Sequence, residues 1–265
     1  RHFSIFIIFF ISLVFFFRLI KDRFGSYLYA FLGVLLIFLS PRIFANSFYN
    51  TKDICFMSLS IINLFYGFKF LNEPNKKNTI IFSLISGLTI GCRILGIYFP
   101  ILIFLIRYID ILRERNPNKK RYSSLFIIIF LVPIFTILFW PYLWENPLEN
   151  FLNVFSELSN HDRPISNFFL GNYISALYVP WNYILIWIFT TTPLFYLAIF
   201  LLGLFFLITR IGKRLIKIDN ENSYNDLWRG RAEQKDLIVL LTIIVPIISI
   251  IILHSSLYTG WRHLY

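Results

Sequence analysis

The chain has 265 residues, of which 57% are hydrophobic, 20% aromatic and only 15% charged, with a formal net charge of +11. A soluble domain of this length carries more charge and spaces its apolar residues at intervals, so the composition argues against a soluble globular protein. In a soluble protein the positive charge would suggest nucleic-acid binding, whereas in a membrane protein it reflects basic cytoplasmic loops. We therefore predict an integral membrane protein with no nucleic-acid partner.

Apolar residues occur in long runs close to the roughly 20 residues that cross a bilayer. Backbone groups in lipid must be satisfied within the segment itself, so each run is predicted to be a helix. The predicted fold class is all-α, a polytopic transmembrane helix bundle with about eight spans of near-bilayer length. In chain order the predicted spans are Phe3–Phe17, Tyr27–Leu39, Ile54–Phe70, Ile80–Ile94, Tyr98–Leu112, Leu125–Leu143, Tyr183–Ile208 and Leu237–Leu253.

The charged residues between these runs predict the topology. Basic residues dominate four loops, which the positive-inside rule places in the cytoplasm. These loops are Arg18–Arg23, Lys69–Lys77, Arg107–Arg121 and Arg210–Lys235. The segment Trp140–Tyr183 has Arg163 as its only cation against four acids, so it is expected outside.

The four basic loops share one side of the membrane only under two conditions. The run Ile80–Leu112 must be a hairpin of two short spans, which the glycines and the proline near its middle allow. The run Tyr183–Ile208 must cross the membrane only once. Pro193 is expected to interrupt its helix, which leaves Trp181–Thr190 as a short or tilted segment before the span.

The outer segment is predicted to contain one further helix. Asn146 and Pro147 fit an N-cap followed by a proline at the first helical position, and Glu149 completes a capping box. The apolar residues that follow fall on one helical face and are Leu148, Phe151, Leu152, Phe155 and Leu158. Two interpretations stay open: an amphipathic helix on the outer membrane surface, or an ordinary helix packed on the bundle.

Other features of the sequence limit the kinds of site and fold that the chain is expected to contain. Cys55 and Cys92 lie in or beside apolar runs without partners at metal-ligand or disulfide spacing, so they are expected to be small buried hydrophobic residues. The chain contains no phosphate-binding glycine loop, no HExxH and no GxSxG, so a soluble nucleotide-sugar fold is not supported. Because the chain starts at Arg1 and stops at Tyr265, directly after a charged motif, we expect it to be an internal part of a longer protein.

Polar residues on the predicted outer side are the candidates for chemistry. They are Arg42, Asn50, Lys52, Asp53, Arg93, His161, Asp162, Arg163, Arg262 and His263, with Trp181 and Trp261 beside them. Cations on this side run against the positive-inside bias, and a cluster of Arg, Lys and His at a lipid–water boundary suits a lipid-linked phosphate or diphosphate. A carboxylate among them could bind a metal, accept a proton or only balance charge.

Each candidate also has a purely structural interpretation. Asp53 opens a span, where a carboxylate favours the helix N-terminus. Arg42 could reach lipid headgroups from a helix end. Arg93 points more strongly to function. It lies between Gly91 and Gly96 at the tip of the predicted hairpin, where an arginine without a binding partner would be energetically unfavourable. The adjacent pair of His161 and Asp162 is a weak metal signal.

Four stretches, in order along the chain, resemble membrane glycosyltransferases of the type C superfamily in bacteria and archaea, in the protein-mannosyltransferase-like branch (family 39). The first is Ser40–Asp53, which follows the pattern SPRxFxxSFYNxKD, and the second is Gly87–Gly96, which contains Arg93. The third runs from Phe169 through Pro180 and Trp181 to Pro193, and the fourth is Gly260–Tyr265.

This resemblance implies a single transmembrane domain over residues 1–265 in a prokaryotic plasma membrane. It implies an enzyme that moves a sugar of the hexosyl or mannosyl type from a polyprenyl-phosphate donor to a protein, lipid or glycan acceptor. The resemblance assigns the donor phosphate to Arg42, Lys52, Arg93, Arg262 and His263. Asp53 would be a secondary acid, because the key acid of this superfamily usually lies in the first outer loop, which we expect upstream of Arg1.

Two other classes stay open. A transporter or flippase of a lipid-linked saccharide would also need cations near a headgroup, but it should show repeat symmetry and polar residues at mid-membrane. A non-catalytic membrane scaffold is the third interpretation. The residues identify no cofactor, and a divalent cation stays open.

Overall fold

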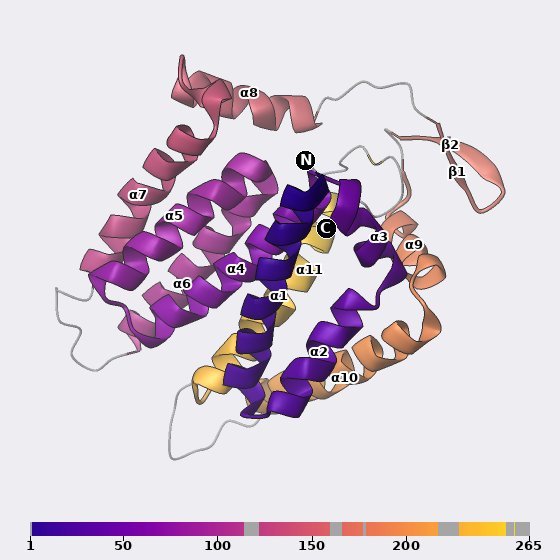
Figure 1. Cartoon of the computed structure of the whole chain (residues 1–265), viewed down its shortest axis with the longest axis horizontal. Coiled ribbons are helices and arrows are strands. Elements are labelled where there is room, and N and C mark those ends of the chain that lie inside the picture. Colours follow the sequence, from indigo (N-terminus) through magenta and orange to yellow (C-terminus); the bar gives the residue numbers. More distant parts are fainter. Residues whose placement is uncertain are drawn as a thin grey trace. The chain divides into compact units, whose positions relative to one another are not determined.

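The computed structural model describes residues 2–113, 122–159, 166–176, 179–216, 228–252 and 257. The chain folds into two compact units, Arg1–Phe151 and Leu152–Leu264 (Figure 1). The first consists of helices, and the second adds a short β-hairpin to helices. The structure confirms the predicted all-α polytopic class, because long apolar helices dominate the described residues of both units.

The first unit contains α-helices and short 3-10 helices. They are α1 (His2–Phe24), α2 (Tyr27–Phe38), α3 (Pro41–Tyr49), α4 (Asp53–Asn72), α5 (Lys76–Cys92), η1 (Ile94–Ile97), α6 (Tyr98–Leu112), α7 (Ser123–Phe139) and η3 (Pro141–Leu143). The helix α8 (Pro147–Ser159) follows and confirms the helix predicted after Trp140. Its apolar residues Leu148 and Leu152 are exposed.

The predicted number of eight spans is too high for the described residues. Five helices there are long and apolar enough to cross a membrane, or six if the bent pair α2 and α3 forms one broken span. The axes of that pair differ by 67°. The helices α5 and α7 have 17 residues each, which is short of the roughly 20 that a full crossing needs. The span Ile80–Ile94 was predicted to be short, whereas Leu125–Leu143 was predicted to be longer than the helix that forms there.

Contacts along the first unit fix which helix ends lie together. The helices α1 and α4 run in the same direction, since Phe6 stacks on Phe48 just before α4 while Phe15 meets Phe65 within it. The helix α5 runs back along α4, where Phe70 stacks on Phe82 with ring centroids 5.7 Å apart. The ends of α1 and α4 and the start of α5 therefore share one end of the unit.

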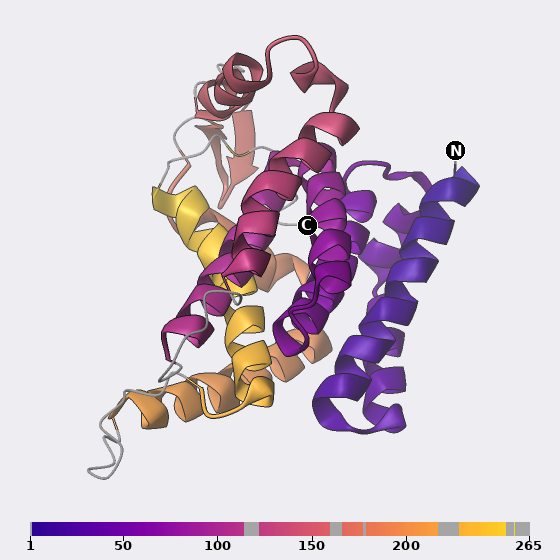
Figure 2. The same ribbon diagram turned by 90° about the vertical axis from the view of Figure 1, so that its left-hand side faces the viewer.

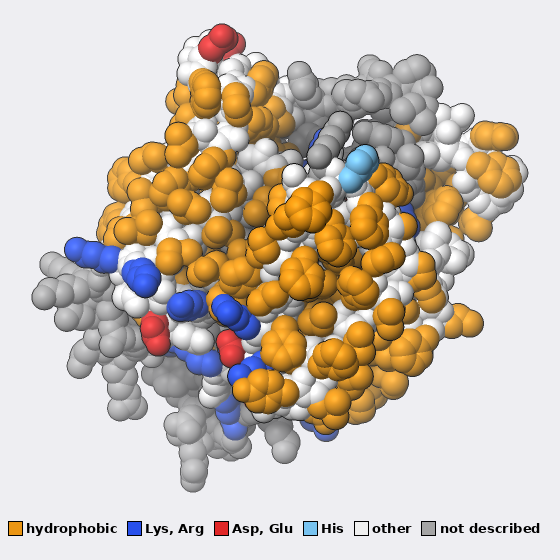
Figure 3. Space-filling view, in the orientation of Figure 1, with side chains coloured by type: hydrophobic (Ala, Val, Ile, Leu, Met, Phe, Trp, Pro, Cys, Tyr) orange, Lys and Arg blue, Asp and Glu red, His pale blue; other side chains and the backbone are white. Residues whose placement is uncertain are grey.

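Lys and Arg side chains gather at this end, as the space-filling view shows (Figure 3). They include Lys21 and Arg23 in the last turn of α1, Lys69 in the last turn of α4, and Lys76 and Lys77 in the first turn of α5. We refer to this set as the basic end. The start of α4 and the end of α5 lie at the opposite end of the unit.

The helices α5 and α7 lie side by side because glycines remove the side chains between them (Figure 2). A Cβ atom on Gly87 would lie 2.5 Å from the Cβ of Phe135, and one on Gly91 would lie 3.3 Å from the carbonyl oxygen of Phe139. Gly87 and Gly91 are four residues apart and form the small-residue pattern that lets membrane helices approach closely. After α5 the chain reverses through η1 into α6, as predicted for Ile80–Leu112.

The connection between the second and third predicted spans is more ordered than the sequence suggested. Residues Pro41–Tyr49, predicted as part of a connecting segment, form the helix α3. Its proline occupies the first helical turn, where the missing N–H has no cost and the fixed φ favours helix. Burial of an apolar side against α1 and α2, through Ile43 and Phe44, stabilises this short helix beyond its own propensity.

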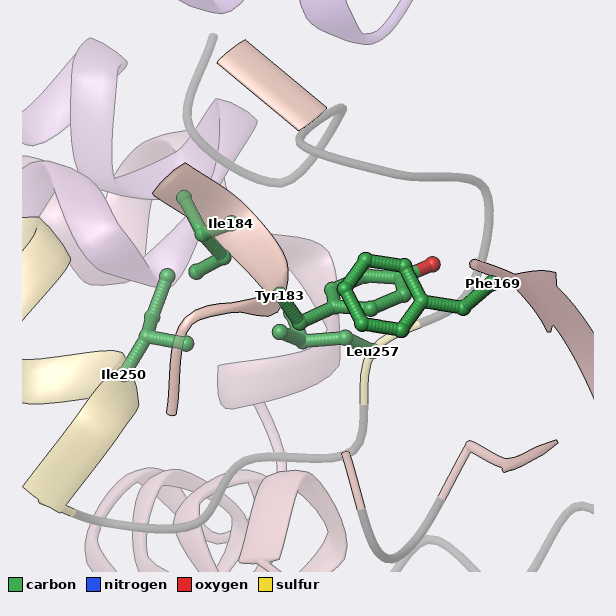
Figure 4. Packing of buried hydrophobic residues seen from close by; sticks show 5 residues of the cluster. All are labelled: Phe169, Tyr183, Ile184, Ile250 and Leu257. Atoms are coloured by element: carbon green, nitrogen blue, oxygen red, sulfur yellow. The ribbon is translucent and has the colours of Figure 1, made fainter. Parts of the chain in front are cut away.

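The second unit contains β1 (Ser166–Phe169), β2 (Asn172–Ser175), α9 (Tyr183–Thr191), α10 (Leu194–Ile216) and α11 (Arg231–Ile252). Pro193 separates α9 from α10, as predicted. The antiparallel strands were not predicted. Phe169, Tyr183, Ile184, Ile250 and Leu257 form a buried cluster that joins the hairpin to α9 and to the residues around the end of α11 (Figure 4).

Candidate functional site

Three side chains at the start of α4 form a hydrogen-bonded corner between α3 and α4. The amide nitrogen Nδ2 of Asn50 donates to Oδ1 of Asn46 at 3.0 Å and to Oδ2 of Asp53 at 2.8 Å. The amide oxygen of Asn50 accepts the backbone N–H of Asp53 at 2.9 Å, which satisfies one of the free donors at the helix start. Asn50 therefore both caps α4 and fixes the carboxylate of its first residue.

Arg93 meets this carboxylate from the end of α5. Its Nη2 donates to Oδ1 of Asp53 in an ion pair, and its guanidinium lies 5.7 Å from the centre of the Phe56 ring. The side chain of Asp53 is 1% exposed and that of Arg93 is 11% exposed. Both carboxylate oxygens of Asp53 thus accept hydrogen bonds, one from Arg93 and one from Asn50.

Buried contacts below the pair hold Arg93 at this position. The carbonyl of Thr89 accepts the backbone N–H of Arg93 at 3.1 Å, and the hydroxyl of Thr89 accepts a hydrogen bond from Asn63 of α4 at 3.2 Å. Gly96 packs so closely that a Cβ there would lie 2.7 Å from the carbonyl oxygen of Thr89. Because Asn63 belongs to the same helix as Asp53, these contacts set the spacing between the two charges.

Two further predicted cations lie in the same part of the first unit. The side chain of Lys52 is exposed beside Asp53, and its backbone carbonyl accepts a weak hydrogen bond from the Cys92 thiol at 3.8 Å. Arg42 is partly exposed on α3, and its backbone carbonyl accepts from Nδ2 of Asn46 at 2.8 Å. Hydrogen bonds between Asn46 and Asn50 and between Asn50 and Asp53 thus connect Arg42 to the carboxylate.

The remaining candidates lie either outside the described residues or in the second unit. Arg262, His263, Trp261, His161, Asp162 and Arg163 lie outside the described residues. Trp181 is exposed in the second unit, where it lines a small apolar pocket of about 20 Å³ with Ile184 and Leu257. Within the described part of the chain, no group of three or more His, Cys, Asp or Glu side chains could hold a metal ion. Cys55 and Cys92 are free and partly buried.

Sequence reasoning found the charged residues of the corner and Asn50, but it missed Asn46, the second amide of the corner. Asn46, Asn50 and Asp53 are spaced at i, i+4 and i+7, which places polar residues on one side of a helical path, and this signal was available. The contribution of Thr89 and Asn63 had no sequence signal, because polar residues inside apolar runs also occur as helix–helix contacts without any link to a site.

The corner lies inside a region that matches a known family. The sequence model of dolichyl-phosphate-mannose-protein mannosyltransferases matches residues 2–140, which is just over half of the chain and includes Asp53 and Arg93. The chain belongs to the dolichyl-phosphate-mannose-protein mannosyltransferase family. It is thus a membrane glycosyltransferase of the mannosyltransferase type, in agreement with the resemblance found in the sequence. Comparison with curated proteins and with solved structures gave no match.

This mannosyltransferase-family chain places its buried ion pair at the end of the first unit opposite the basic end. A guanidinium held by a carboxylate at the boundary of a helix bundle can bind an anion through its remaining N–H groups. Asp53 and Arg93 form an ion pair between the first residue of α4 and the residue that follows α5.

Proposed function

We propose that this protein transfers a hexosyl residue, of the mannosyl type, from a polyprenyl-phosphate donor to a hydroxyl of a protein, lipid or glycan acceptor. The reaction would occur on the extracytoplasmic face of a prokaryotic plasma membrane. Family membership supports the sugar-transfer chemistry. The observation that carries the assignment to a lipid phosphate is the nearly buried Arg93, held by Asp53 at the end opposite the basic end.

In this proposal Arg93 binds the phosphate that links sugar to lipid. When the acceptor hydroxyl attacks the anomeric carbon, the bond to the phosphate oxygen breaks and negative charge develops on the leaving phosphate. A guanidinium already oriented toward that phosphate stabilises this charge without reorganising. Its planar fork can also grip two phosphate oxygens at once, which a lysine ammonium cannot reproduce.

We propose a positioning role for Asp53 in place of the secondary acid that the resemblance implies. Its carboxylate is 1% exposed and already accepts hydrogen bonds from Arg93 and Asn50, so it is poorly placed to take a proton from an acceptor hydroxyl. A general base must reach the proton that it abstracts. We therefore assign Asp53 to the orientation of Arg93.

The more exposed cations nearby would extend the anion site toward solvent and headgroups. Lys52 is exposed next to Asp53, and Arg42 is partly exposed one helix earlier. Their long side chains can reach a phosphate from a helix end. Arg262 and His263 are proposed as further donor contacts from the sequence alone.

The substitution Arg93→Lys tests the donor assignment in purified full-length enzyme. It keeps the positive charge and the pairing with Asp53 but removes the bidentate grip on the phosphate. Loss of one charge-assisted hydrogen bond costs roughly 1.5–3 kcal/mol. We expect a loss in catalytic efficiency with a lipid-linked sugar of about tenfold to a hundredfold, at about 1.4 kcal/mol per decade.

The matched control is Arg113→Lys, the same exchange just after α6. It should leave transfer unchanged, and both variants should unfold at the temperature of the parent protein. Lipid-linked and nucleotide-linked sugars are assayed in parallel. Transfer from the nucleotide sugar alone would contradict the donor class, and unchanged kinetics in Arg93→Lys would contradict the role of Arg93. Movement of an intact lipid-linked saccharide across the membrane without transfer would favour the transporter class.

A further inference from the structure

The β-hairpin of the second unit ends in a tight two-residue turn. The strands pair Phe168 with Tyr173 and Phe169 with Asn172, which leaves Leu170 and Gly171 as the turn. Both turn residues have positive φ, 49° for Leu170 and 87° for Gly171. This is the backbone of a type I′ turn, whose right-handed twist matches that of the strands and which favours Asn-Gly over other pairs.

One face of the hairpin is fixed to the rest of the second unit. Phe169 packs on Tyr183 at the start of α9, with ring centroids 4.9 Å apart (Figure 4). Nδ2 of Asn167 donates to the carbonyl of Leu257 at 2.6 Å, and the backbone N–H of Leu257 donates to the carbonyl of Ala176 at 3.0 Å. Leu257 follows the end of α11, a candidate membrane span. The base of the hairpin is therefore held near the level at which that span ends.

The other face of the hairpin presents aromatic side chains to its surroundings. Phe168 and Tyr173 lie opposite each other in an edge-to-face pair, with centroids 5.3 Å apart. They are 59% and 78% exposed, and Leu170 at the tip is 68% exposed. Large apolar groups gathered on a surface outside any helical span mark an interaction site.

The residue at the tip is itself unusual for its backbone. Leu170 is the non-glycine residue with positive φ among the residues that the structure describes. This conformation costs a leucine roughly 1–2 kcal/mol, whereas Asn or Gly adopts it readily. A residue that fits its backbone poorly points to a use for its side chain.

We propose that this hairpin is an interfacial anchor, with Phe168, Leu170 and Tyr173 inserted into the headgroup region of the bilayer. The surrounding sequence favours lipid over other partners, because no charged residue occurs between Arg163 and Arg210. A site for an acidic peptide would offer basic side chains beside the rings, whereas the exposed face of this hairpin adds two serines and no charged residue to its aromatic pair.

The hairpin backbone also limits how deeply the hairpin can enter the bilayer. The two strands leave unpaired N–H and C=O groups along their outer edges, and these cannot enter the hydrocarbon core without a large cost. At the headgroup level water still satisfies those groups, and this is where Tyr, Trp and similar aromatic residues concentrate in membrane proteins. In this proposal the exposed Trp181, just before α9, is a further aromatic residue at the headgroup level. The anchor is independent of the sugar-transfer proposal.

A depth measurement on the full chain in phosphatidylglycerol and phosphatidylethanolamine vesicles tests the anchor. A nitroxide is attached at Asn172→Cys, beside the tip, after Cys55→Ser and Cys92→Ser remove the native thiols. Collisions with oxygen report lipid exposure, and collisions with a water-soluble nickel chelate report water exposure. We expect the native hairpin label to be more accessible to oxygen and less accessible to the nickel chelate than a fully hydrated label.

Two variants should move the label outward for different reasons. Phe168→Ser with Tyr173→Ser removes the inserted rings, and the ratio of docked to undocked hairpin should fall about tenfold, which corresponds to about 1.4 kcal/mol. Leu170→Asn improves the turn yet should also shift the label toward water, a result that a purely structural role for Leu170 does not give. Phe206→Ser, a matched change at an exposed ring on α10, should leave the label depth unchanged.

Three results would overturn the anchor. The native label could be as open to the nickel chelate as a fully hydrated one, which would place the hairpin in water. It could be shielded from both reagents, which would indicate that a protein or glycan covers it. Its depth could also be unaffected by the loss of both rings.

Discussion

The two ends of the first unit use cations in opposite ways. At the basic end Lys21 lies 4.0 Å from the centre of the Tyr27 ring and donates to its hydroxyl at 2.7 Å, in an exposed setting. At the other end Arg93 is nearly buried and pairs with a carboxylate that is 1% exposed. The basic end is rich in lysines that solvent can reach, whereas the other end has a guanidinium that the protein holds in one place.

We propose that this difference separates charges that orient the protein in the membrane from charges that recognise a ligand. Positive residues beside cytoplasmic helix ends act together and each contributes little. A buried ion pair costs desolvation energy, so it persists only where its geometry and further hydrogen bonds compensate. The partner of a cation and its burial therefore say more about its role than the charge does.

The largest effect is expected from breaking the buried pair. Asp53→Ala leaves the guanidinium of Arg93, 11% exposed, without its carboxylate, and removal of one partner of a buried pair costs about 3–5 kcal/mol. The free energy of unfolding in detergent measures this loss. The double variant Asp53→Ala with Arg93→Ala should lose less than the sum of the two single variants, by about 0.5–3 kcal/mol of coupling.

Asp22→Ala provides the control for that substitution. Asp22 is an exposed carboxylate in the last turns of α1, at the basic end. Surface changes of this kind stay within about 0.5 kcal/mol. Equal losses in Asp22→Ala and Asp53→Ala would show that the two ends do not differ as described.

An intermediate effect is expected where the backbone positions Arg93. Gly96→Ala adds a Cβ that would lie 2.7 Å from the carbonyl oxygen of Thr89, and backbone atoms cannot yield as a flexible side chain can. Overpacking of this kind costs about 1–3 kcal/mol. Because the same carbonyl accepts the N–H of Arg93, donor use should fall together with unfolding free energy.

Gly203→Ala is the matched glycine substitution. Nothing lies within 4 Å of a Cβ at Gly203, which is inside the helix α10. Alanine there should stabilise the protein by about 0.5–1 kcal/mol through helix propensity. A gain in stability from Gly96→Ala would show that the close approach seen at η1 does not constrain the chain.

The sequence predicted those parts of the fold that local pattern determines. The helix Tyr98–Leu112 has the predicted bounds, the break at Pro193 is present, and the chain reverses near Arg93. Each has a strong local cause: an uninterrupted apolar run, a proline, or a group of glycines. The number of spans was overestimated because α5 and α7 owe their place to helix–helix packing through Gly87 and Gly91, which mean hydropathy does not register.

The candidate site was predicted only as a set of residues expected together. The sequence placed Asp53 and Arg93 on the same predicted side, but their pairing depends on a hydrogen bond between Asn63 and Thr89 inside the apolar runs that begin after Asp53 and end at Arg93. The strands of the hairpin were missed because Phe168–Tyr173 was interpreted as part of a long outer loop. Its Leu-Gly turn lacks the Asn-Gly or Asp-Gly signal of a type I′ hairpin.

The smallest effect is expected at the basic end. Lys21→Gln removes one cation above the Tyr27 ring, an interaction that contributes about 0.5–1 kcal/mol at exposed sites. Tyr27→Phe keeps the ring and removes only the hydroxyl, so it separates the hydrogen bond from the ring contact. Since Lys69, Lys76 and Lys77 remain, neither variant should alter membrane orientation or sugar transfer, as measured by protease accessibility and by the donor assay. A loss of transfer from Lys21→Gln as large as that from Arg93→Lys would mean that exposed and buried cations serve one function.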